Sequence, residues 1–240
     1  IRWFYSKKAL HSPGYDAILD WILLRFIPRL PLPENPKILD LGCGNGRVLR
    51  VLRSVIPSSV LFGLDISDAH VRRLRSEGFD VSLTDIGVEL LPFRDDFFDL
   101  CLMFDVIEHL FDPDHALDEV RRVLKRRTAF LVLKTPNLAF WINRFLLGIG
   151  IQPLHTEVST RKVLGRRYSL LGQGDDTVGH IRVFTLPALL DMVAMHHFTV
   201  EQAMGFPNGR LKGLLRVIDS LLSECPSLSD SLLLVLTKTV

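Results

Sequence analysis

The feature that most constrains the fold is the stretch Lys37 to Leu49, KILDLGCGNGRVL, an apolar run followed by alternating glycines. Gly42, Gly44 and Gly46 let the backbone turn tightly and approach a ligand closely, because no Cβ stands in the way. The residues after the glycines have a helical pattern, so the turn lies where a strand gives way to a helix N-terminus. This stretch therefore predicts a strand, a ligand-binding turn and a helix.

Short β-rich runs alternate with helical runs along most of the chain. The predicted strands are 37–42, 60–65, 80–85, 97–105, 128–136, 198–206 and 231–240, and the predicted helices are 46–56, 67–78, 112–125, 186–197 and 209–222. Alternation of this kind implies right-handed βαβ units and a buried, mostly parallel sheet. The first half therefore reads as a doubly wound α/β unit.

The ligand of the glycine turn is constrained by what the turn lacks. A dinucleotide-binding turn needs a third glycine where this chain has Arg47. A phosphate-binding P-loop needs Gly-Lys-Ser/Thr, and Asn45-Gly46-Arg47 does not supply it. Both phosphate-binding interpretations are therefore disfavoured.

Three acids stand at or near the ends of three successive predicted strands. Asp40 stands two residues before the first glycine and suits a ligand that carries an ammonium group. Asp65 ends the next strand, where its two oxygens can accept both hydroxyls of a ribose, and Asp85 can accept an adenine amino hydrogen. Open α/β sheets bind ligands at the carboxyl edge, so these acids predict one crevice there.

At these residues the chain resembles the class I S-adenosylmethionine-dependent methyltransferases, over nearly its whole length. ILDLGCGNG is similar to their first motif, LFGLDIS to their ribose-binding segment, LTDIGVELLPFRDDFFD to their adenine segment and FLVLKTPN to their fifth strand. The resemblance is to the type 11 and type 23 branch, which includes ubiquinone-pathway O-methyltransferases. It implies a Rossmann-like, doubly wound α/β fold, in which seven mostly parallel strands have helices on both faces and the last hairpin is reversed.

The resemblance also implies S-adenosylmethionine as cofactor and a set of residues that bind it. That set is Asp40, Gly42, Cys43, Gly44, Gly46, Asp65, Ile66, Asp85, Ile86 and Phe104, with Ile66 and Ile86 flanking the adenine. Two turns depart from the family pattern. Arg126-Arg127-Thr128 replaces the usual Pro-Gly-Gly before the fifth strand, and His197 replaces a glycine before the sixth.

The run FDVIEHL is expected to face the methyl acceptor. The resemblance places Asp105, Glu108 and His109 after the fourth strand, with His180 returning over the site from a later insertion. His109 is the candidate base and Glu108 the residue that orients it, so His109, Glu108 and His180 are the catalytic candidates. Alternatively, Asp105 or Glu108, together with His109 and His180, holds a divalent cation such as Mg²⁺. The plainer alternative is that Glu108 and His109 cap a helix and that His180 is structural.

We expect a single methyltransferase domain over 1–240, with a lid and insertion at 138–180 and a small helical insertion at 207–223. Basic residues of the first insertion either grip an acidic acceptor or RNA, or form a solvated face; they are Arg161, Lys162, Arg166 and Arg167. Apolar residues of the same region either line an acceptor pocket or simply pack; they are Trp141, Phe145, Tyr168, Leu170 and Leu171.

Composition excludes several classes of protein. A net charge of +2 and 23% charged residues indicate an ordinary globular chain and give no support to nucleic-acid binding. Cys43, Cys101 and Cys225 lack metal-ligand spacing, which favours free thiols in a reducing, cytoplasmic environment. The N-terminal IRWFYSKKAL does not read as a signal peptide. The longest apolar patches are interrupted by charged and polar residues, so no transmembrane segment is expected.

The function predicted from the sequence is transfer of a methyl group to a hydroxyl of a small, partly apolar molecule. One alternative is a metal-assisted RNA 2′-O-methyltransferase. It is less favoured, because a small-molecule acceptor is a more favoured partner than nucleic acid. Another is a non-catalytic subunit that binds S-adenosylmethionine and needs a partner. The predicted helix at 208–223 is either a homodimer face or packs on the sheet. A mean hydropathy of +0.24 fits a greasy substrate, a membrane surface, a subunit contact or a large core.

Overall fold

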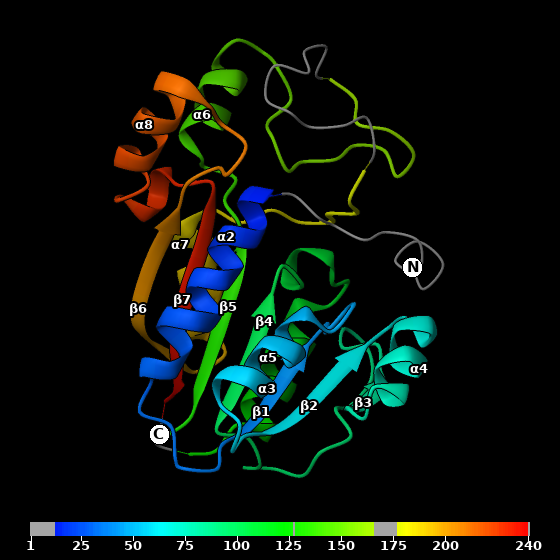
Figure 1. Cartoon of the computed structure of the whole chain (residues 1–240). Helices are drawn as coiled ribbons and strands as arrows, with labels where there is room; N and C mark the ends of the chain where they lie inside the picture. Colours follow the sequence, from blue (N-terminus) through cyan, green and yellow to red (C-terminus); the bar gives the residue numbers. More distant parts are fainter. Residues whose placement is uncertain (1–12, 127, 166–176, 240) are drawn as a thin grey trace.

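The computed structural model describes residues 13–126, 128–165 and 177–239, which fold around one seven-stranded sheet (Figure 1). The strands are β1 (Lys37–Leu41), β2 (Val60–Asp65), β3 (Asp80–Leu83), β4 (Leu100–Phe104), β5 (Phe130–Pro136), β6 (Phe198–Phe206) and β7 (Ser231–Lys238). Their order is β3-β2-β1-β4-β5-β7-β6. Strands β1 to β5 are parallel, and β7 is antiparallel to both β5 and β6. The predicted sheet, with its reversed last hairpin, is confirmed.

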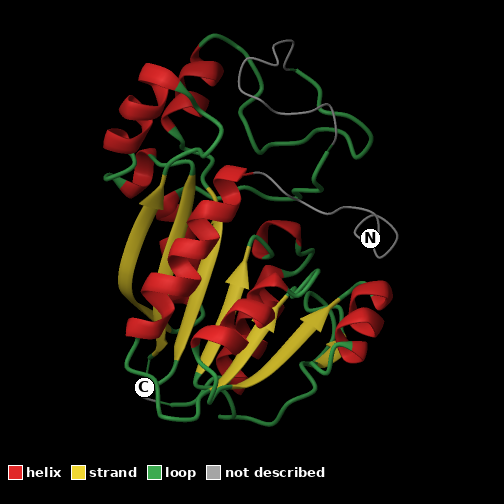
Figure 2. Cartoon of the chain, in the orientation of Figure 1, coloured by secondary structure: helices red, strands yellow, loops and turns green. Residues whose placement is uncertain are grey.

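Helices cover both faces of the sheet (Figure 2). They are α2 (Pro13–Trp21), α3 (Arg47–Val55), α4 (Asp68–Ser76), α5 (Pro113–Val123), α6 (Trp141–Gly148), α7 (Leu186–Met195) and α8 (Gly213–Leu222). Successive side chains of β1 point to opposite faces, as the pleat requires. Leu39 and Leu41 join the core under α5 and α7, whereas Ile38 joins the core under α2 and α3. The sheet is therefore doubly wound.

Helix α2 has no counterpart among the helices predicted from the sequence. It continues into a π-helical turn, Ile22–Phe26, and a 3₁₀ turn, Ile27–Arg29. Leu19, Ile22 and Ile27 of this segment pack against Val132 and Leu233 of the sheet. The segment covers the sheet, which explains its apolar character. Among the described residues, no helix combines the length and apolar composition needed to cross a bilayer.

Local sequence signals set several element ends. The side chain of Asp112 accepts a hydrogen bond from the backbone N–H of His115 at 2.9 Å, and Pro113 occupies the first turn of α5. At the start of β6, His197 has φ of 56°, the left-handed conformation that a glycine would adopt easily. His197, which stands where the family pattern has a glycine, therefore adopts the backbone conformation that the glycine would have.

Helices α6 and α8 lie together beyond the carboxyl edge of the sheet (Figure 1). Phe140 and Ile142 of the first segment pack with Leu211 of the second in a small separate core. The indole of Trp141 donates a hydrogen bond from Nε1 to Oδ1 of Asp219 at 2.8 Å. The two stretches that the sequence set apart as insertions thus contact each other.

The glycine at the start of α3 gives a stability prediction. Gly46 has φ of 82°, and a Cβ there would lie 2.1 Å from Cδ2 of the fully buried Leu74. Gly78 has the same φ, but a Cβ there would meet nothing within 4 Å. We expect Gly78→Ala to lower the free energy of unfolding by about 1–2 kcal/mol, the backbone cost alone. We expect Gly46→Ala to lower it by about 1–3 kcal/mol more, because overpacking adds to that cost. Urea unfolding measures both, and equal losses would contradict this packing.

Candidate active site

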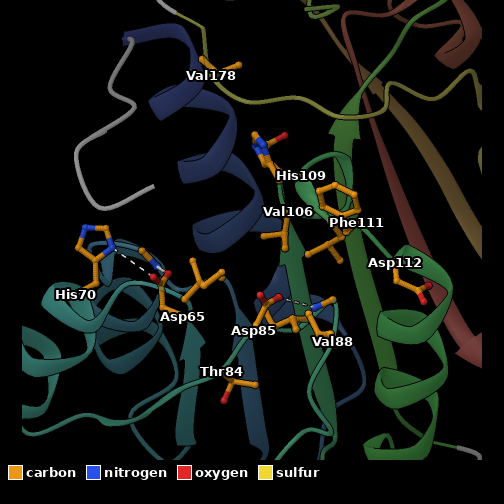
Figure 3. Close-up of a pocket in the computed structure, with 17 residues that line it drawn as sticks. Asp65, His70, Thr84, Asp85, Val88, Val106, His109, Phe111, Asp112 and Val178 are labelled. Atoms are coloured by element: carbon orange, nitrogen blue, oxygen red, sulfur yellow. Dashed lines mark hydrogen bonds and ion pairs between the residues drawn. The ribbon is translucent and has the colours of Figure 1, made fainter. Parts of the chain in front are cut away.

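A cavity of about 690 Å³ opens at the carboxyl ends of β1 to β4 (Figure 3). Its walls come from the segments that follow these four strands, including Gly42, Asp65, Asp85 and Val106. Val178, from the insertion, also lines it. Segments far apart in the sequence therefore meet around one space, at the edge where open α/β sheets bind ligands.

Backbone hydrogen bonds fix the glycine turn against the end of β2. The N–H groups of Gly42 and Cys43 both donate to the carbonyl of Leu64, at 2.8 and 2.9 Å. Gly42 has φ of 73°, and a Cβ there would lie 2.5 Å from Cγ2 of Val106. The turn therefore fits between β2 and the segment after β4 only because residue 42 is glycine.

Asp65 is held by the same turn and lines the cavity. Its Oδ2 accepts from the backbone N–H of Gly44 at 2.7 Å, and its Oδ1 accepts from that of Ser67 at 2.8 Å. Nδ1 of His70 lies 3.5 Å from Oδ1 (Figure 3). The carboxylate thus has a fixed orientation, as a side chain that receives two ligand hydroxyls should.

Asp85, in the segment after β3, lines the same cavity. Its Oδ1 accepts from the backbone N–H of Gly87 at 3.2 Å, which closes a tight turn after β3. Ile66 and Ile86 line the cavity beside Asp65 and Asp85. This side combines two carboxylates with two branched apolar side chains, which suits a ribose and a flat ring.

Asp105 leaves β4 with φ of 53° and pairs with a buried lysine. Both of its oxygens accept from Nζ of Lys134, at 2.8 and 2.7 Å, and the lysine side chain is only 4% exposed. Each charge neutralises the other, since a buried charge is tolerated mainly when paired. The carboxylate of Asp105 consequently faces Lys134 on β5.

Glu108 lies fully buried in the 3₁₀ turn Ile107–His109. Its Oε2 accepts from the hydroxyl of Thr135 at 3.0 Å, whereas its Oε1 has no hydrogen-bond partner among the described residues. Burial, with a smaller contribution from Asp105, raises the pKa of Glu108 to about 8. The carboxyl group is therefore largely protonated at neutral pH.

Two histidines stand beside Glu108. Nδ1 of His109 bonds the carbonyl of Gly179 at 3.0 Å, and Nδ1 of His180 bonds the carbonyl of His155 at 2.7 Å. A carbonyl only accepts, so both Nδ1 atoms carry hydrogen. Burial lowers the pKa of His109 and lowers that of His180 to about 3. Both imidazoles are therefore neutral, with the lone pair on Nε2.

The insertion is fastened to the segment after β4. The backbone N–H groups of Ile181 and Arg182 donate to the carbonyl of Glu108, at 2.9 and 3.1 Å. The guanidinium of Arg182 also donates to the carbonyls of Leu110 and Phe111. These contacts bring Glu108, His109 and His180 together, with one ligand atom from each within 4.8 Å of the others.

Comparison with known proteins identifies the family. Residues 39–132 match the family model of a methyltransferase domain. A probable S-adenosylmethionine-dependent methyltransferase of Mycolicibacterium smegmatis is 30% identical over 168 residues, covering 69% of this chain and 62% of that protein. The chain belongs to the class I S-adenosylmethionine-dependent methyltransferases. S-adenosylmethionine is the methyl donor of this family.

Other relatives match shorter parts of this chain. The ubiquinone/menaquinone biosynthesis C-methyltransferase UbiE of Bordetella avium is 33% identical over 118 residues, covering 47% of this chain and 46% of that protein. A tRNA (carboxymethyluridine(34)-5-O)-methyltransferase of Arabidopsis thaliana is 34% identical over 131 residues, covering 50% of this chain and 31% of that protein. The chain thus spans less than two thirds of the length of each of these relatives.

The fold has counterparts among solved structures of methyltransferases. A chain in the complex between the Haloferax volcanii Trm112 methyltransferase activator and a putative methyltransferase superposes with a TM-score of 0.61. The match covers 95% of both chains at 17% identity. At this identity the likeness concerns the fold alone.

The structure brings most of the predicted cofactor residues to the cavity. Gly42, Gly44, Asp65, Ile66, Asp85 and Ile86 line it, and so do Asp105 and His109 from the acceptor side. Asp40, Cys43, Gly46 and Phe104 lie behind this lining. Asp40 is buried, its Oδ2 has no partner among the described residues, and burial and then Asp65 raise its pKa.

None of the insertion residues that were predicted to line a pocket or to grip an acceptor is found among the described cavity residues. Trp141 bonds Asp219 and Phe145 is 65% exposed, and neither lines the cavity. Arg161 and Lys162 are exposed. Five further predicted residues lie outside the described residues: Arg166, Arg167, Tyr168, Leu170 and Leu171.

Sequence reasoning missed several residues that shape the acceptor side. Lys134 and Thr135 of β5 hold Asp105 and Glu108, and Arg182 fastens the insertion. A lysine within the apolar run FLVLKTP was a signal that a buried acid lies opposite. The role of Arg182 depends on a contact 71 residues away in the chain, which no local pattern reveals.

Asp65 gives the test of the cofactor side. Replacing Asp65 by alanine removes the carboxylate that we expect to receive two ribose hydroxyls. We predict that the affinity for S-adenosylhomocysteine falls about 10- to 100-fold, the effect of losing charge-assisted hydrogen bonds. Asp68→Ala is the matched control, because Asp68 is a half-exposed acid on α4 outside the cavity. Isothermal titration calorimetry compares the two, and equal affinities would contradict the assignment.

Proposed function

We propose that this methyltransferase transfers the methyl group of S-adenosylmethionine to a hydroxyl oxygen of a small, partly apolar acceptor. The observation that carries the proposal is that one cavity is lined both by Asp65 and Asp85 and by the neutral imidazole of His109. A base on the wall of the cofactor cavity is what methylation of a hydroxyl requires, since a proton must leave as the new bond forms.

The cofactor residues would act by position. Asp65 would receive the ribose hydroxyls, Asp85 would accept the adenine amino hydrogen, and Ile66 and Ile86 would flank the ring. The bound sulfonium supplies an electrophilic methyl group. Displacement at such a carbon depends mainly on orienting the acceptor and excluding water. The apolar side chains of Val106, Leu110 and Phe111 would serve that purpose on the acceptor side.

His109 would take the proton. Its Nδ1–H is held by the carbonyl of Gly179, so Nε2 presents the lone pair. As the acceptor oxygen bonds to the methyl carbon and the carbon–sulfur bond breaks, the hydroxyl proton passes to Nε2 of His109. Burial lowers the pKa of His109, so the imidazole is neutral and ready to accept a proton at neutral pH.

Removing the imidazole tests this role. We predict that His109→Gln lowers the methyl-transfer rate about 100-fold or more, the usual worth of a positioned base. Binding of S-adenosylhomocysteine should change less than threefold, because His109 is not among the residues assigned to the cofactor. His115→Gln on α5 is the control, since His115 lies outside the cavity. A variant with wild-type turnover would overturn the assignment of the base.

A second candidate, metal-assisted transfer, is favoured by the cluster of Glu108, His109 and His180. Both imidazoles donate Nδ1–H to backbone carbonyls, which is the arrangement that orients histidines toward a metal. Oε1 of Glu108 is buried without a partner among the described residues. These donors fit a divalent cation, which would lower the pKa of an acceptor hydroxyl.

The donor set indicates which cation would fit. Two imidazoles and one carboxylate suit Zn²⁺, Mn²⁺ or Fe²⁺ better than Mg²⁺, which prefers oxygen ligands. Asp105, the fourth predicted ligand, is engaged by Lys134. For this candidate the acceptor could be RNA, as the name of the Arabidopsis relative and the exposed Arg161 and Lys162 suggest.

One incubation separates these candidates. The purified protein is mixed with methyl-labelled S-adenosylmethionine and cell extract, with and without a chelator, and the extract is fractionated. We predict label in the small-molecule or lipid fraction at a rate that the chelator leaves unchanged. Label in RNA, with loss of activity on chelation and recovery with Zn²⁺ or Mn²⁺, would favour the second candidate. Cofactor binding without any transfer would contradict both and favour a subunit that needs a partner.

A further inference from the structure

His180 owes its orientation to a residue of its own insertion. Its Nδ1 donates to the backbone carbonyl of His155 at 2.7 Å, and its ring centroid lies 4.9 Å from that of His109. The position of one carbonyl group therefore decides where the lone pair of His180 points. A contact that holds the backbone of His155 therefore also helps to orient the ring of His180.

His155 has an unusual backbone that its side chain holds in place. Its φ is 67°, the left-handed region that residues with a Cβ rarely adopt without outside support. Its ring supplies that support, because Nε2 donates to Oδ1 of Asp230 at 2.9 Å. Both side chains are largely buried, at 17% and 15% exposed. The ring is an anchor, and the carbonyl of the same residue holds His180.

Asp230 is itself held firmly at the start of β7. Its Oδ1 also accepts from Nδ2 of Asn208 at 2.9 Å, and its backbone bonds both Phe206 and Asn137. Burial alone would raise the pKa of Asp230, but His155 and Asn208 outweigh it, and the pKa lies below the usual value. Asp230 therefore carries a negative charge opposite the imidazole of His155.

The anchor reaches both helices beyond the sheet edge. The backbone N–H of Asn208 donates to Oδ2 of Asp219 at 2.6 Å, and Trp141 donates to Oδ1 of the same carboxyl group. Asp219 is fully buried on α8, and Trp141 begins α6. A continuous chain of hydrogen bonds thus runs from α6 and α8 through Asp230 and His155 to His180 (Figure 1 shows the helices).

We propose that Asp230 and His155 are positioning residues that hold His180 in one tautomer and one orientation toward His109 and Glu108. The inference rests on the proposed function, in which His109 takes the proton on the wall of the cavity and His180 packs beside it. It extends the site to the C-terminal hairpin, beyond the 39–132 segment that the methyltransferase family model matches. His180 then keeps hydrogen on Nδ1 and the lone pair on Nε2.

The tautomer of His180 can be observed directly. Side-chain ¹H–¹⁵N spectra of histidine-labelled full-length protein distinguish Nδ1–H from Nε2–H, and His180→Gln assigns the signal. We expect the Nδ1–H form alone in the wild type. We expect mixed tautomers in Asp230→Ala and in His155→Asn, an asparagine being tolerant of the left-handed backbone but lacking the anchoring ring. Asp230→Asn should restore the wild-type spectrum, because its Oδ1 still accepts from His155.

Kinetics provide the second measurement. We expect Asp230→Ala and His155→Asn to lower kcat about 10- to 100-fold through misplacement of His180, while affinity for S-adenosylhomocysteine stays unchanged. Asp191→Ala, at an exposed acid of α7, is the control. If Asp230→Ala does not fold, His155→Asn decides. A wild-type His180 protonated at Nε2, or folded variants with a single Nδ1–H tautomer and wild-type kcat, would overturn the proposal. Absence of methyl transfer by the wild type would count against the proposed function, and the tautomer result would still decide the positioning.

Discussion

The site depends on the hydrogen bonds that fasten the glycine turn of β1 to the end of β2. Gly42 and Cys43 donate to Leu64, and Gly44 donates to the carboxylate of Asp65. This requires left-handed backbone at Gly42 and Gly44, and it leaves no room for a Cβ beside Val106. Hydrogen bonds within the protein thereby hold the strand ends together and orient Asp65. Such preorganisation avoids the cost of ordering the site on binding.

The wall that we assign to the acceptor carries little net charge, because its ionisable side chains are either paired or neutral. Lys134 neutralises Asp105, Glu108 holds a proton, and both histidines stay neutral because they are buried. A wall of low net charge suits a displacement in which the donor brings its own positive charge. It also keeps the imidazole lone pair available. An exposed histidine would be protonated, and so lack that lone pair, in a larger fraction of molecules at neutral pH.

Much of this structure could be predicted from the sequence because its signals are local. Strand and helix periodicity, the cap at Asp112 and the glycine turn each depend on neighbouring residues, and all appear in the structure. The acids at the ends of β2 and β3 line the cavity because strand ends meet at one edge of a parallel sheet. Asp40 lies within β1 rather than after it, so the strand buries its side chain behind the turn.

The parts that could not be predicted depend on contacts between distant segments. The pair of Lys134 and Asp105 spans 29 residues, the bond from Arg182 to Phe111 spans 71, and that from His155 to Asp230 spans 75. Lys134 and Asp105 each stand out within their own segments, but no local pattern shows which distant residue either of them contacts. Helix α2 was missed because its apolar residues gave no strand or cofactor motif, although they cover the sheet.

The most direct test of the account is a crystal structure of the protein with S-adenosylhomocysteine. We predict that the ribose hydroxyls lie on Asp65, the adenine lies between Ile66 and Ile86, and the sulfur faces His109 across the cavity. A product bound elsewhere, or bound here with its sulfur directed away from His109, would contradict the claim that cofactor and base share one site.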